Sequence, residues 1–258
     1  MGIGRRKFIK YAGLTTVAGI LGRNPIDVLA DDELPVSSEP LKPIVGKRWA
    51  MVVNLKKCRQ KEGCHDCIDA CHNVHNVPDF GNPKDEVKWI WKDRFEHAFT
   101  EQEHEYISEE VKHSETLLFC NHCDNAPCVR VCPTQATWQR DDGIVMMDMH
   151  RCIGCRYCLV ACPYGSRSFN WRDPRPFIKE TDPNFPTRMR GVVEKCNFCA
   201  ERLAKGQMPA CVEACSEGCL VFGDLEDPES EVRELLRSNF TIRRKPGLGT
   251  KPEVYYIV

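Results

Sequence analysis

Cysteine is the residue type with the clearest chemistry in this 258-residue chain, which contains 17 of them. An odd number cannot close into disulfides alone, and a chain of this length does not need disulfide stapling. Both points indicate metal binding. Sixteen of the cysteines form four sets, which are Cys58, Cys64, Cys67 and Cys71; Cys120, Cys123, Cys128 and Cys132; Cys152, Cys155, Cys158 and Cys162; and Cys196, Cys199, Cys211 and Cys215.

The spacing within the sets is typical of iron–sulfur ligands. Two residues between thiolates allow a tight loop to wrap one corner of an iron–sulfur cube. The third set is followed by Pro163 and matches the bacterial ferredoxin run without exception. Every set ends in a gap of three residues, which places the fourth cysteine one helical turn past the third and directs it to a second cluster. The sets are therefore expected to work in pairs. The four sets predict four 4Fe–4S clusters, each bound by three cysteines from one set and one from the set paired with it.

Zinc binding and disulfide bonding are the alternative roles for these cysteines, and both stay open. Zinc also binds four thiolates from C-x2-C pairs, although it does not require the spacing of the third set. A disulfide scaffold suits an exported protein, although cysteines this close in sequence pair poorly. Covalent c-type haem is not expected, because the chain has no C-x-x-C-H. We interpret Cys219, the seventeenth cysteine, as a buried inert thiol.

The remaining residue types with metal or acid–base chemistry are less informative. No set lacks a cysteine, so none of the eight histidines is needed as a ligand, and we expect surface or interface positions for them. His72, His75 and His122 lie beside the sets. Trp89 and Trp91 lie two residues apart between Lys88 and Lys92, so they form either core packing or a docking face. No nucleophile, acid–base pair or phosphate-binding loop is apparent, which favours an electron carrier over a catalytic subunit.

Short strands and helices are expected to position the sets. Asp141-Asp142-Gly143 predicts a hairpin turn, and Asp227 with the following proline predicts a helix that runs to about Leu236. Two long segments, 72–116 and 172–190, interrupt the pattern, and we expect them to make external contacts such as docking a partner. The predicted strands are Trp49–Leu55, Thr116–Phe119, Gln135–Arg140, Ile144–Asp148, Gly191–Glu194 and Leu220–Gly223.

Composition excludes several classes of protein. The apolar fraction of 42% and the charged fraction of 28% are ordinary for a folded protein. No apolar run reaches the roughly 18 residues that a membrane-spanning helix needs. Lys and Arg number 36 against 37 Asp and Glu, so there is no basic excess that would indicate nucleic-acid binding.

The first 30 residues resemble an export signal. They carry five basic and one acidic side chain, with Arg5 and Arg6 ahead of a short apolar stretch. This arrangement is typical of a twin-arginine signal, either cleaved or kept as an anchor. That route moves folded proteins, which suits a metal cluster that is assembled before export. Residues 31–47 contain three prolines and predict a linker.

From about Arg48 to its end, the chain resembles the four-cluster ferredoxin-like subunits of respiratory oxidoreductases. The resemblance rests on the four sets, on the prolines after the second and third, on the gap of eleven before Cys211, and on the closing Gly249–Tyr256. Five segments look most like the exported iron–sulfur subunits of membrane complexes of dissimilatory sulfur metabolism. They are CIDACHNVHNVP (67–78), KDEVKWIWK (84–92), CNHCDNAPCVRVCP (120–133), RCIGCRYCLVACPYGSRSFNWRDPRPF (151–177) and EKCNFCAERLAKGQMPACVEAC (194–215).

The resemblance implies an α+β fold of two interleaved bacterial 2×(4Fe–4S) ferredoxin-like modules with insertions, preceded by the signal helix. One module would comprise residues 48–116 with 188–258, and the other residues 117–187. The resemblance pairs the first set with the fourth and the second with the third. The implied cluster sites are site 1 (Cys58, Cys64, Cys67 and Cys215), site 2 (Cys71, Cys196, Cys199 and Cys211), site 3 (Cys120, Cys123, Cys128 and Cys162) and site 4 (Cys132, Cys152, Cys155 and Cys158).

The resemblance also implies a function. These subunits carry electrons between a quinone-binding integral membrane subunit and a periplasmic partner, for which we expect a multihaem cytochrome c in a complex of sulfur or sulfate metabolism. The expected location is the outer face of the cytoplasmic membrane. An electron-transfer subunit of a molybdopterin oxidoreductase is the alternative. A zinc-stabilised binding module is the alternative from another class.

Overall fold

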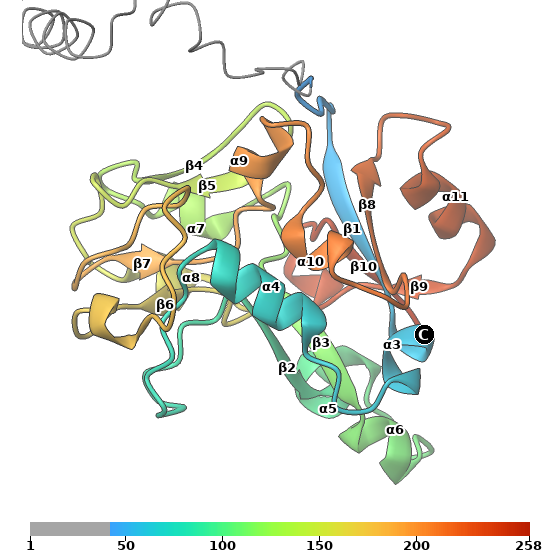
Figure 1. Ribbon diagram of the computed structural model, residues 1–258. Helices are drawn as coiled ribbons and strands as arrows, with labels where there is room; N and C mark the ends of the chain where they lie inside the picture. Colours follow the sequence, from blue (N-terminus) through green and yellow to red (C-terminus); the bar gives the residue numbers. More distant parts are fainter. Residues whose placement is uncertain (1–41) are drawn as a thin grey trace, which may run out of the picture. The chain divides into compact units, whose positions relative to one another are not determined.

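Four small sheets and a series of short helices carry the cysteine loops (Figure 1). The computed structural model describes residues 42–258, which form one compact unit. The predicted export signal in residues 1–30 and most of the predicted linker 31–47 lie outside the described residues. Within residues 42–258, no helix is long and apolar enough to cross a membrane.

The largest sheet has two apolar faces. It contains, in this order, β8 (Leu220–Asp224), β1 (Trp49–Asn54), β10 (Val254–Ile257) and β9 (Thr241–Ile242). β1 and β10 are parallel, and the other neighbours are antiparallel. Side chains alternate along β1, so Ala50 and Val52 pack with the helix α11 (Glu231–Ser238), whereas Met51 and Val53 enter the main core. The strands predicted at Trp49–Leu55 and Leu220–Gly223 are confirmed as β1 and β8, to within one residue at each end.

The remaining strands form three two-stranded antiparallel sheets. They are β2 (Ile90–Arg94) with β3 (Glu115–Phe119), β4 (Thr137–Gln139) with β5 (Val145–Met147), and β6 (Ser168–Phe169) with β7 (Val193–Glu194). The predicted hairpin is confirmed, and Gly143 at its turn has φ of 84°, a value that glycine adopts without strain. β6 and β7 pair across the predicted module boundary, so the two halves share a sheet.

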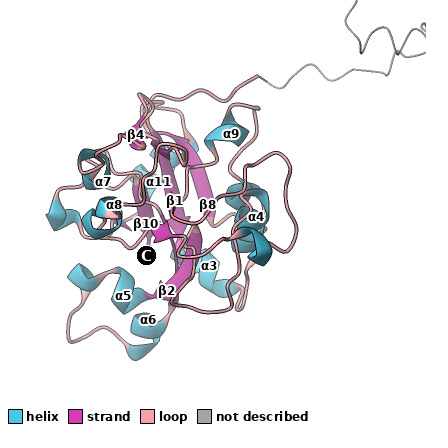
Figure 2. Cartoon of the chain, turned by 90° about the vertical axis from the view of Figure 1, so that its left-hand side faces the viewer, coloured by secondary structure: helices cyan, strands magenta, loops and turns pink. Residues whose placement is uncertain are grey.

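The helices are short, and two pairs of them bring different cysteine sets together. The helices are α3 (Leu55–Gln60), α4 (Asp66–Val74), α5 (Phe95–Ala98), α6 (Glu109–His113), α7 (Pro127–Arg130), α8 (Tyr157–Ala161), α9 (Ala200–Leu203), α10 (Ala210–Glu213) and α11, with 3-10 turns at Thr100–Gln102, Arg175–Phe177 and Pro246–Leu248. α4 packs on α10, and α7 packs on α8. Figure 2 shows α7 and α8 side by side and apart from α4.

Two apolar cores surround the cysteines. The main core includes cysteines of the first and fourth sets, and a smaller core includes cysteines of the second and third. The structure is thus a mixed α/β fold with small sheets. The exact division into residues 48–116 with 188–258 and residues 117–187 stays a prediction.

The beginning of α11 corrects one prediction. A helix was expected from Asp227 to Leu236, but α11 begins at Glu231. The carbonyl of Asp227 accepts a hydrogen bond from the Ser230 N–H at 3.2 Å in a turn, and the Ser230 hydroxyl then accepts one from the Arg233 N–H at 3.3 Å as the N-cap. Aspartate and serine are both favourable N-caps, so the local sequence did not distinguish them.

The burial of several rings also differs from expectation. Trp89 and Trp91 are only 1% and 7% exposed, so they are core residues and the docking-face alternative is wrong. His75 and His122 are each 1% exposed, although surface or interface positions were expected for the histidines. The Nδ1 atom of each histidine has a backbone hydrogen-bond partner, which is the Cys71 carbonyl for His75 and the Val145 N–H for His122.

Candidate metal centres

A common backbone turn shapes the loop of every cysteine set. The residue before the second cysteine has a positive φ in each, at Gly63 (68°), His122 (41°), Gly154 (69°) and Phe198 (54°). This conformation is strained for residues other than glycine. The rings of His122 and Phe198 stack at 3.7 Å between centroids, so packing between the second and fourth sets supports the two strained positions.

Cysteines from different sets converge at three cavities. The cavity of site 1 is lined by all four cysteines of that site, and the same holds for the cavities of sites 3 and 4. In each cavity three thiols come from one set and the fourth comes from its mate. The structure therefore brings together the residues that the crossed arrangement requires.

The thiols of site 2 lie close enough together to raise one another's pKa values. Burial raises the pKa of Cys71 well above its ordinary value, and the thiols of Cys199, Cys211 and Cys196 raise it further. Burial raises the pKa of Cys211 in the same way, and the thiols of Cys199 and Cys196 raise it further. The four cysteines of site 2 are therefore also gathered in one place.

The fourth cysteine of each set reaches the cluster site of the paired set in one of two ways. In the first set, α4 carries Cys67 to site 1 and Cys71 to site 2, four residues apart on its buried face. In the other sets the expected helix ends earlier. Cys132 and Cys215 lie beyond the last residues of α7 and α10, and Cys162 is the C-cap of α8. A turn, not a continuing helix, delivers these three thiols.

The crowded thiols require a bound cation to ionise. Burial raises the pKa of Cys67 to about 12, with further contributions from Cys58 and Cys215. The pKa of Cys123 is also raised to about 12, mainly by burial and next by the neighbouring thiol of Cys120. Metal binding displaces such protons and supplies the missing positive charge. Four convergent thiols of this kind fit a 4Fe–4S cluster, which would use them as iron ligands and would accept and release single electrons.

Site 4 differs, because polar groups stabilise one of its thiolates. Burial alone would raise the pKa of Cys132. The backbone N–H of Thr137 and the hydroxyl and N–H of Thr134 outweigh that effect and lower it. The Cys132 sulfur lies 3.7 Å from the Thr134 hydroxyl oxygen. Hydrogen bonds to ligand sulfurs also adjust the reduction potential of a cluster.

A buried cation lies between sites 3 and 4. Arg167 is 6% exposed, and its Nη2 donates to the Cys128 sulfur at 3.1 Å and to the Thr137 hydroxyl at 2.8 Å. Burial would lower its pKa, but the charges of Cys128 in site 3 and Cys158 in site 4 outweigh burial and raise it. The guanidinium therefore interacts with both sites.

A second buried cation lies between sites 2 and 3. Lys195 is 1% exposed, and its Nζ donates to the carbonyl oxygens of Cys196, at 2.6 Å, and Val145. Burial lowers its pKa, while the charge of Cys120 in site 3 and that of Cys196 in site 2 oppose the effect. The thiol of Cys120 also raises the pKa of Cys196, after burial. Sites 2 and 3 are therefore neighbours.

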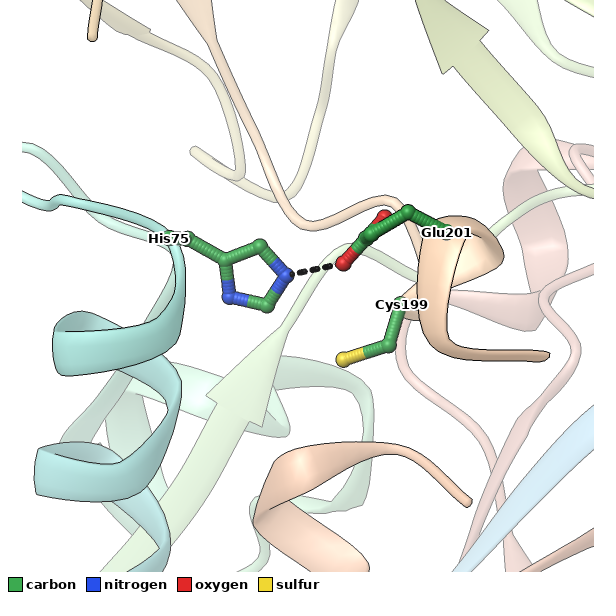
Figure 3. Close-up of side chains that lie close together, drawn as sticks. All are labelled: His75, Cys199 and Glu201. Carbon is green, nitrogen blue, oxygen red and sulfur yellow. Dashed lines mark hydrogen bonds and ion pairs between the residues drawn. The ribbon is translucent and has the colours of Figure 1, made fainter. Parts of the chain in front are cut away.

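A histidine–carboxylate pair lies beside site 2 (Figure 3). His75 Nε2 is 2.9 Å from Glu201 Oε1, and Nδ1 is 2.8 Å from the carbonyl oxygen of Cys71. The His75 and Glu201 side chains and the Cys199 thiol offer ligand atoms within 4.8 Å of one another. A separate ion there would compete with site 2 for Cys199. We therefore interpret His75 and Glu201 as support for site 2.

A buried ion pair holds this histidine in place. Arg188 and Glu194 are 2.6 Å apart, with side chains 1% and 0% exposed. The Trp89 Nε1–H donates to Glu194 at 2.9 Å, and its ring stacks on that of His75 at 4.4 Å between centroids. Arg188 also donates to the carbonyl oxygens of His75 and Asn76. The segment after α4 is thus fixed by the C-terminal half of the chain.

These ionisable residues, of which Arg167 and Lys195 are buried and Glu201 is half-buried, were not anticipated from the sequence. Lys195 and Glu201 lie within two residues of cysteines of the fourth set, and Arg167 lies five residues after Cys162. Their positions next to the sets were visible. Their burial was not, because a charged side chain in a loop normally lies in solvent.

The two long insertions line a groove that contains no cysteine. Its walls include Asp79, Phe80, Phe177 and Lys179. The first insertion also contributes Phe95 to the main core, so its role is not confined to the surface. Docking of a partner by the insertions stays a prediction.

The sites form a series of neighbours. Sites 1 and 2 share the segments of α4 and α10, sites 3 and 4 share the segments of α7 and α8, and sites 2 and 3 meet at Lys195. The class of protein that this fold and these sites define is a ferredoxin-like electron carrier with several clusters.

Comparisons with known proteins agree with this class. A family model described as a 4Fe-4S dicluster domain matches residues 114–175 and 183–225. The chain is 40% identical to the Hdr-like menaquinol oxidoreductase iron-sulfur subunit 1 of Archaeoglobus fulgidus, over 98% of this chain and 97% of that one. It is 34% identical to a subunit of the tetrathionate reductase of Salmonella typhimurium, over 98% and 87%. It is 35% identical to the menaquinone reductase iron-sulfur cluster-binding subunit of Nitratidesulfovibrio vulgaris, over 81% and 88%.

The chain belongs to the family of oxidoreductase iron–sulfur subunits that contain the 4Fe–4S dicluster domain. It is an electron-transfer subunit with multiple 4Fe–4S clusters, and it is not itself the catalytic subunit. This result decides against the zinc-stabilised binding module.

Proposed function

We propose that this chain holds four 4Fe–4S clusters, one at each of sites 1 to 4, and passes electrons along them between two partner subunits. The observation that carries the proposal is the series of four neighbouring thiol groups, each with three cysteines from one set and one from the set paired with it. Neighbouring sites share helices or a buried cation, so no site is isolated from the series. The cluster supplies one-electron redox chemistry, and this chain's residues position it and adjust its surroundings.

One partner in this proposal is a quinone-binding integral membrane subunit. Two relatives are named as parts of a menaquinol oxidoreductase and a menaquinone reductase. The other partner is a periplasmic multihaem cytochrome c, and the complex serves sulfur metabolism. These are the expectations for DsrO, the exported iron–sulfur subunit of the membrane complex of dissimilatory sulfur metabolism, which this chain resembles. The chain reaches the outer face of the membrane by the twin-arginine route. Replacing both Arg5 and Arg6 by Lys should therefore leave cluster-loaded protein in the cytoplasm, detected by cell fractionation and iron analysis.

A molybdopterin oxidoreductase is the second candidate complex. Relatives in the comparison include subunits of a tetrathionate reductase and of a selenate reductase. Because the same electron carrier serves either complex, the partner distinguishes them. Purification of the complex from native membranes, followed by haem and molybdenum analysis of the co-purified subunits, decides between the two.

Metal content tests the proposal most directly. Four cubane clusters require about 16 iron and about 16 acid-labile sulfide atoms per chain, with broad absorption near about 400 nm. Anaerobically purified protein should show these values. A result near eight or twelve iron atoms would show that a site is unused or holds a different cluster.

A further inference from the structure

Site 1 contains five thiols, whereas sites 2, 3 and 4 contain four each. Cys219 lines the same cavity as the four cysteines of site 1 and is 3% exposed. Its thiol therefore lies beside those of Cys58 and Cys215. All 17 cysteines lie within the described residues, so no other site has a spare thiol of this kind.

Local backbone structure fixes Cys219 at this position. Gly218 has φ of 58°, and its N–H donates to the Cys215 carbonyl at 3.1 Å, which turns the chain back toward the cavity. The Cys219 N–H donates to the Cys215 sulfur at 3.2 Å. The Cys219 carbonyl accepts from the Asn54 N–H at 2.8 Å at the end of β1. The thiol is therefore held at site 1 by the pairing of β1 and β8.

A cubane at site 1 would take four thiolate ligands, which leaves one of the five cysteines that line the cavity as a thiol. A neutral thiol is a weak S–H donor, and the adjacent cluster thiolates are its available acceptors.

We propose that Cys219 is a ligand-competent reserve thiol of site 1. In the native chain it donates its S–H to the sulfurs of Cys215 and Cys58, and it binds the iron in place of Cys215 when that thiolate is absent. In the exchange an iron–sulfur bond to Cys219 forms, its S–H bond breaks, and the proton passes to water. No electron moves. This inference rests on the proposed function, because it requires a cluster at site 1.

The first experiment removes the crossed-in thiol of each site in turn. The variants are Cys215→Ala for site 1 and, as matched controls, Cys71→Ala, Cys162→Ala and Cys132→Ala. Each control should lose about one iron atom and show the EPR signal of a three-iron cluster, because a cubane with three thiolates loses its unique iron. Cys215→Ala should keep its full iron content without that signal. The double variant Cys215→Ala/Cys219→Ala should behave like the controls.

If Cys215→Ala gives a three-iron cluster like the other variants, the reserve role is wrong. All iron values are read against the unmodified protein. An unmodified chain with fewer than the expected iron atoms would instead count against the proposed function, so the two failures are distinguishable. A spectrum of each variant also shows whether the remaining clusters are assembled.

The second experiment tests the role of Cys219 in the native chain. Cys219→Ala should keep all iron and lower the reduction potential of one cluster only, because the variant loses a donor to cluster sulfur. Cys219→Ser keeps a hydroxyl donor and should give a smaller shift, as measured by EPR-monitored redox titration. An unchanged potential in Cys219→Ala would exclude the hydrogen bond. Loss of iron from Cys219→Ala, with full iron in Cys215→Ala, would make Cys219 the native ligand and overturn the proposal.

Discussion

Sites 3 and 4 are built from neighbouring sequence, whereas sites 1 and 2 join the two ends of the described chain. The cysteines of sites 3 and 4 all lie between Cys120 and Cys162, and α7 packs directly on α8. Sites 1 and 2 combine Cys58–Cys71 with Cys196–Cys215, brought together by α4 on α10 and by β1 on β8. The ligand chemistry is the same, but one half depends on local contacts and the other on long-range packing.

The surroundings of the two halves differ in charge. Arg167 places a positive charge between sites 3 and 4 and contacts the Cys128 sulfur. Site 2 has instead the His75–Glu201 pair, and site 1 has the additional thiol of Cys219. Since hydrogen bonds, charge and exposure set cluster potentials, similar cysteine sets need not give similar potentials. Ligand spacing and redox environment are therefore separate properties of this chain.

The largest expected effect comes from breaking the buried ion pair that supports the long-range half. Glu194→Ala leaves the charge of Arg188 unpaired in the interior and removes the acceptor of the Trp89 N–H. Loss of one partner of a buried pair costs about 3–5 kcal/mol, or a fall in Tm of roughly 10 °C. Thermal unfolding of the cluster-loaded protein measures this effect. Hydrogen exchange should rise around residues 72–91 before it rises around 120–162.

An exposed pair provides the control. Asp173 and Arg175 have side chains 41% and 59% exposed. Asp173→Ala should therefore change Tm by no more than about 1–2 °C, because exposed ion pairs contribute little. Equal effects of Asp173→Ala and Glu194→Ala would contradict the role given to the buried pair.

The next largest effect is damage to a single cluster in the local half. Cys132→Ala should affect the same cluster as Cys155→Ala, and Cys162→Ala the same cluster as Cys128→Ala. The reason is that each fourth cysteine lines the cavity of the mate set. Redox titration with EPR detection identifies the altered cluster by its potential. If Cys132→Ala instead affects the cluster of Cys123, each set binds its own cluster and the paired architecture is wrong.

A smaller effect is expected from removing the cation between sites 3 and 4. Arg167→Met should lower the potentials of both clusters by on the order of 50–100 mV, because a nearby positive charge stabilises the reduced, more negative state. The clusters at sites 1 and 2 should shift less. Arg130→Met, on the exposed surface of α7, is the matched control with the same change in net charge. Equal shifts in both variants would show that Arg167 acts only through net charge.

The smallest effect concerns the sheet that joins the two ends of the described chain. Burial would raise the pKa of Asp224, but the N–H groups of Lys47, Glu226 and Arg48 outweigh it and lower the pKa below its ordinary 3.8. A lowered folded pKa contributes stability that is complete above 3.8 and is lost as pH falls through the folded value. At neutral pH, Asp224→Ala should therefore lower Tm by roughly a few degrees. The difference from the unmodified protein should shrink below about pH 3.8. A difference that stays constant with pH would contradict this account.

Much of the fold near the cysteines was predictable because its signals are local. The hairpin at Asp141-Asp142-Gly143 and the strand beginning at Trp49 follow from turn chemistry and apolar patterning, and the structure confirms both. The beginning of α11 at Glu231 was not predictable, because Asp227 and Ser230 are equally suitable caps. The burial of His75, Trp89 and Lys195 was not predictable either, because each of them has a hydrogen-bond partner that lies between 50 and 126 positions away in the sequence.

The sequence by itself indicated metal binding by the four cysteine sets and favoured iron–sulfur clusters. Spacing within the four sets specifies tight thiolate loops around iron–sulfur clusters, and that geometry involves only a few consecutive residues. The tertiary structure decided what surrounds each loop. Packing of α4 on α10 and of β1 on β8 places a fifth thiol at site 1, and burial turns Arg167 into a charge shared by sites 3 and 4. Burial and long-range contacts are properties of the whole fold, so no local pattern records them.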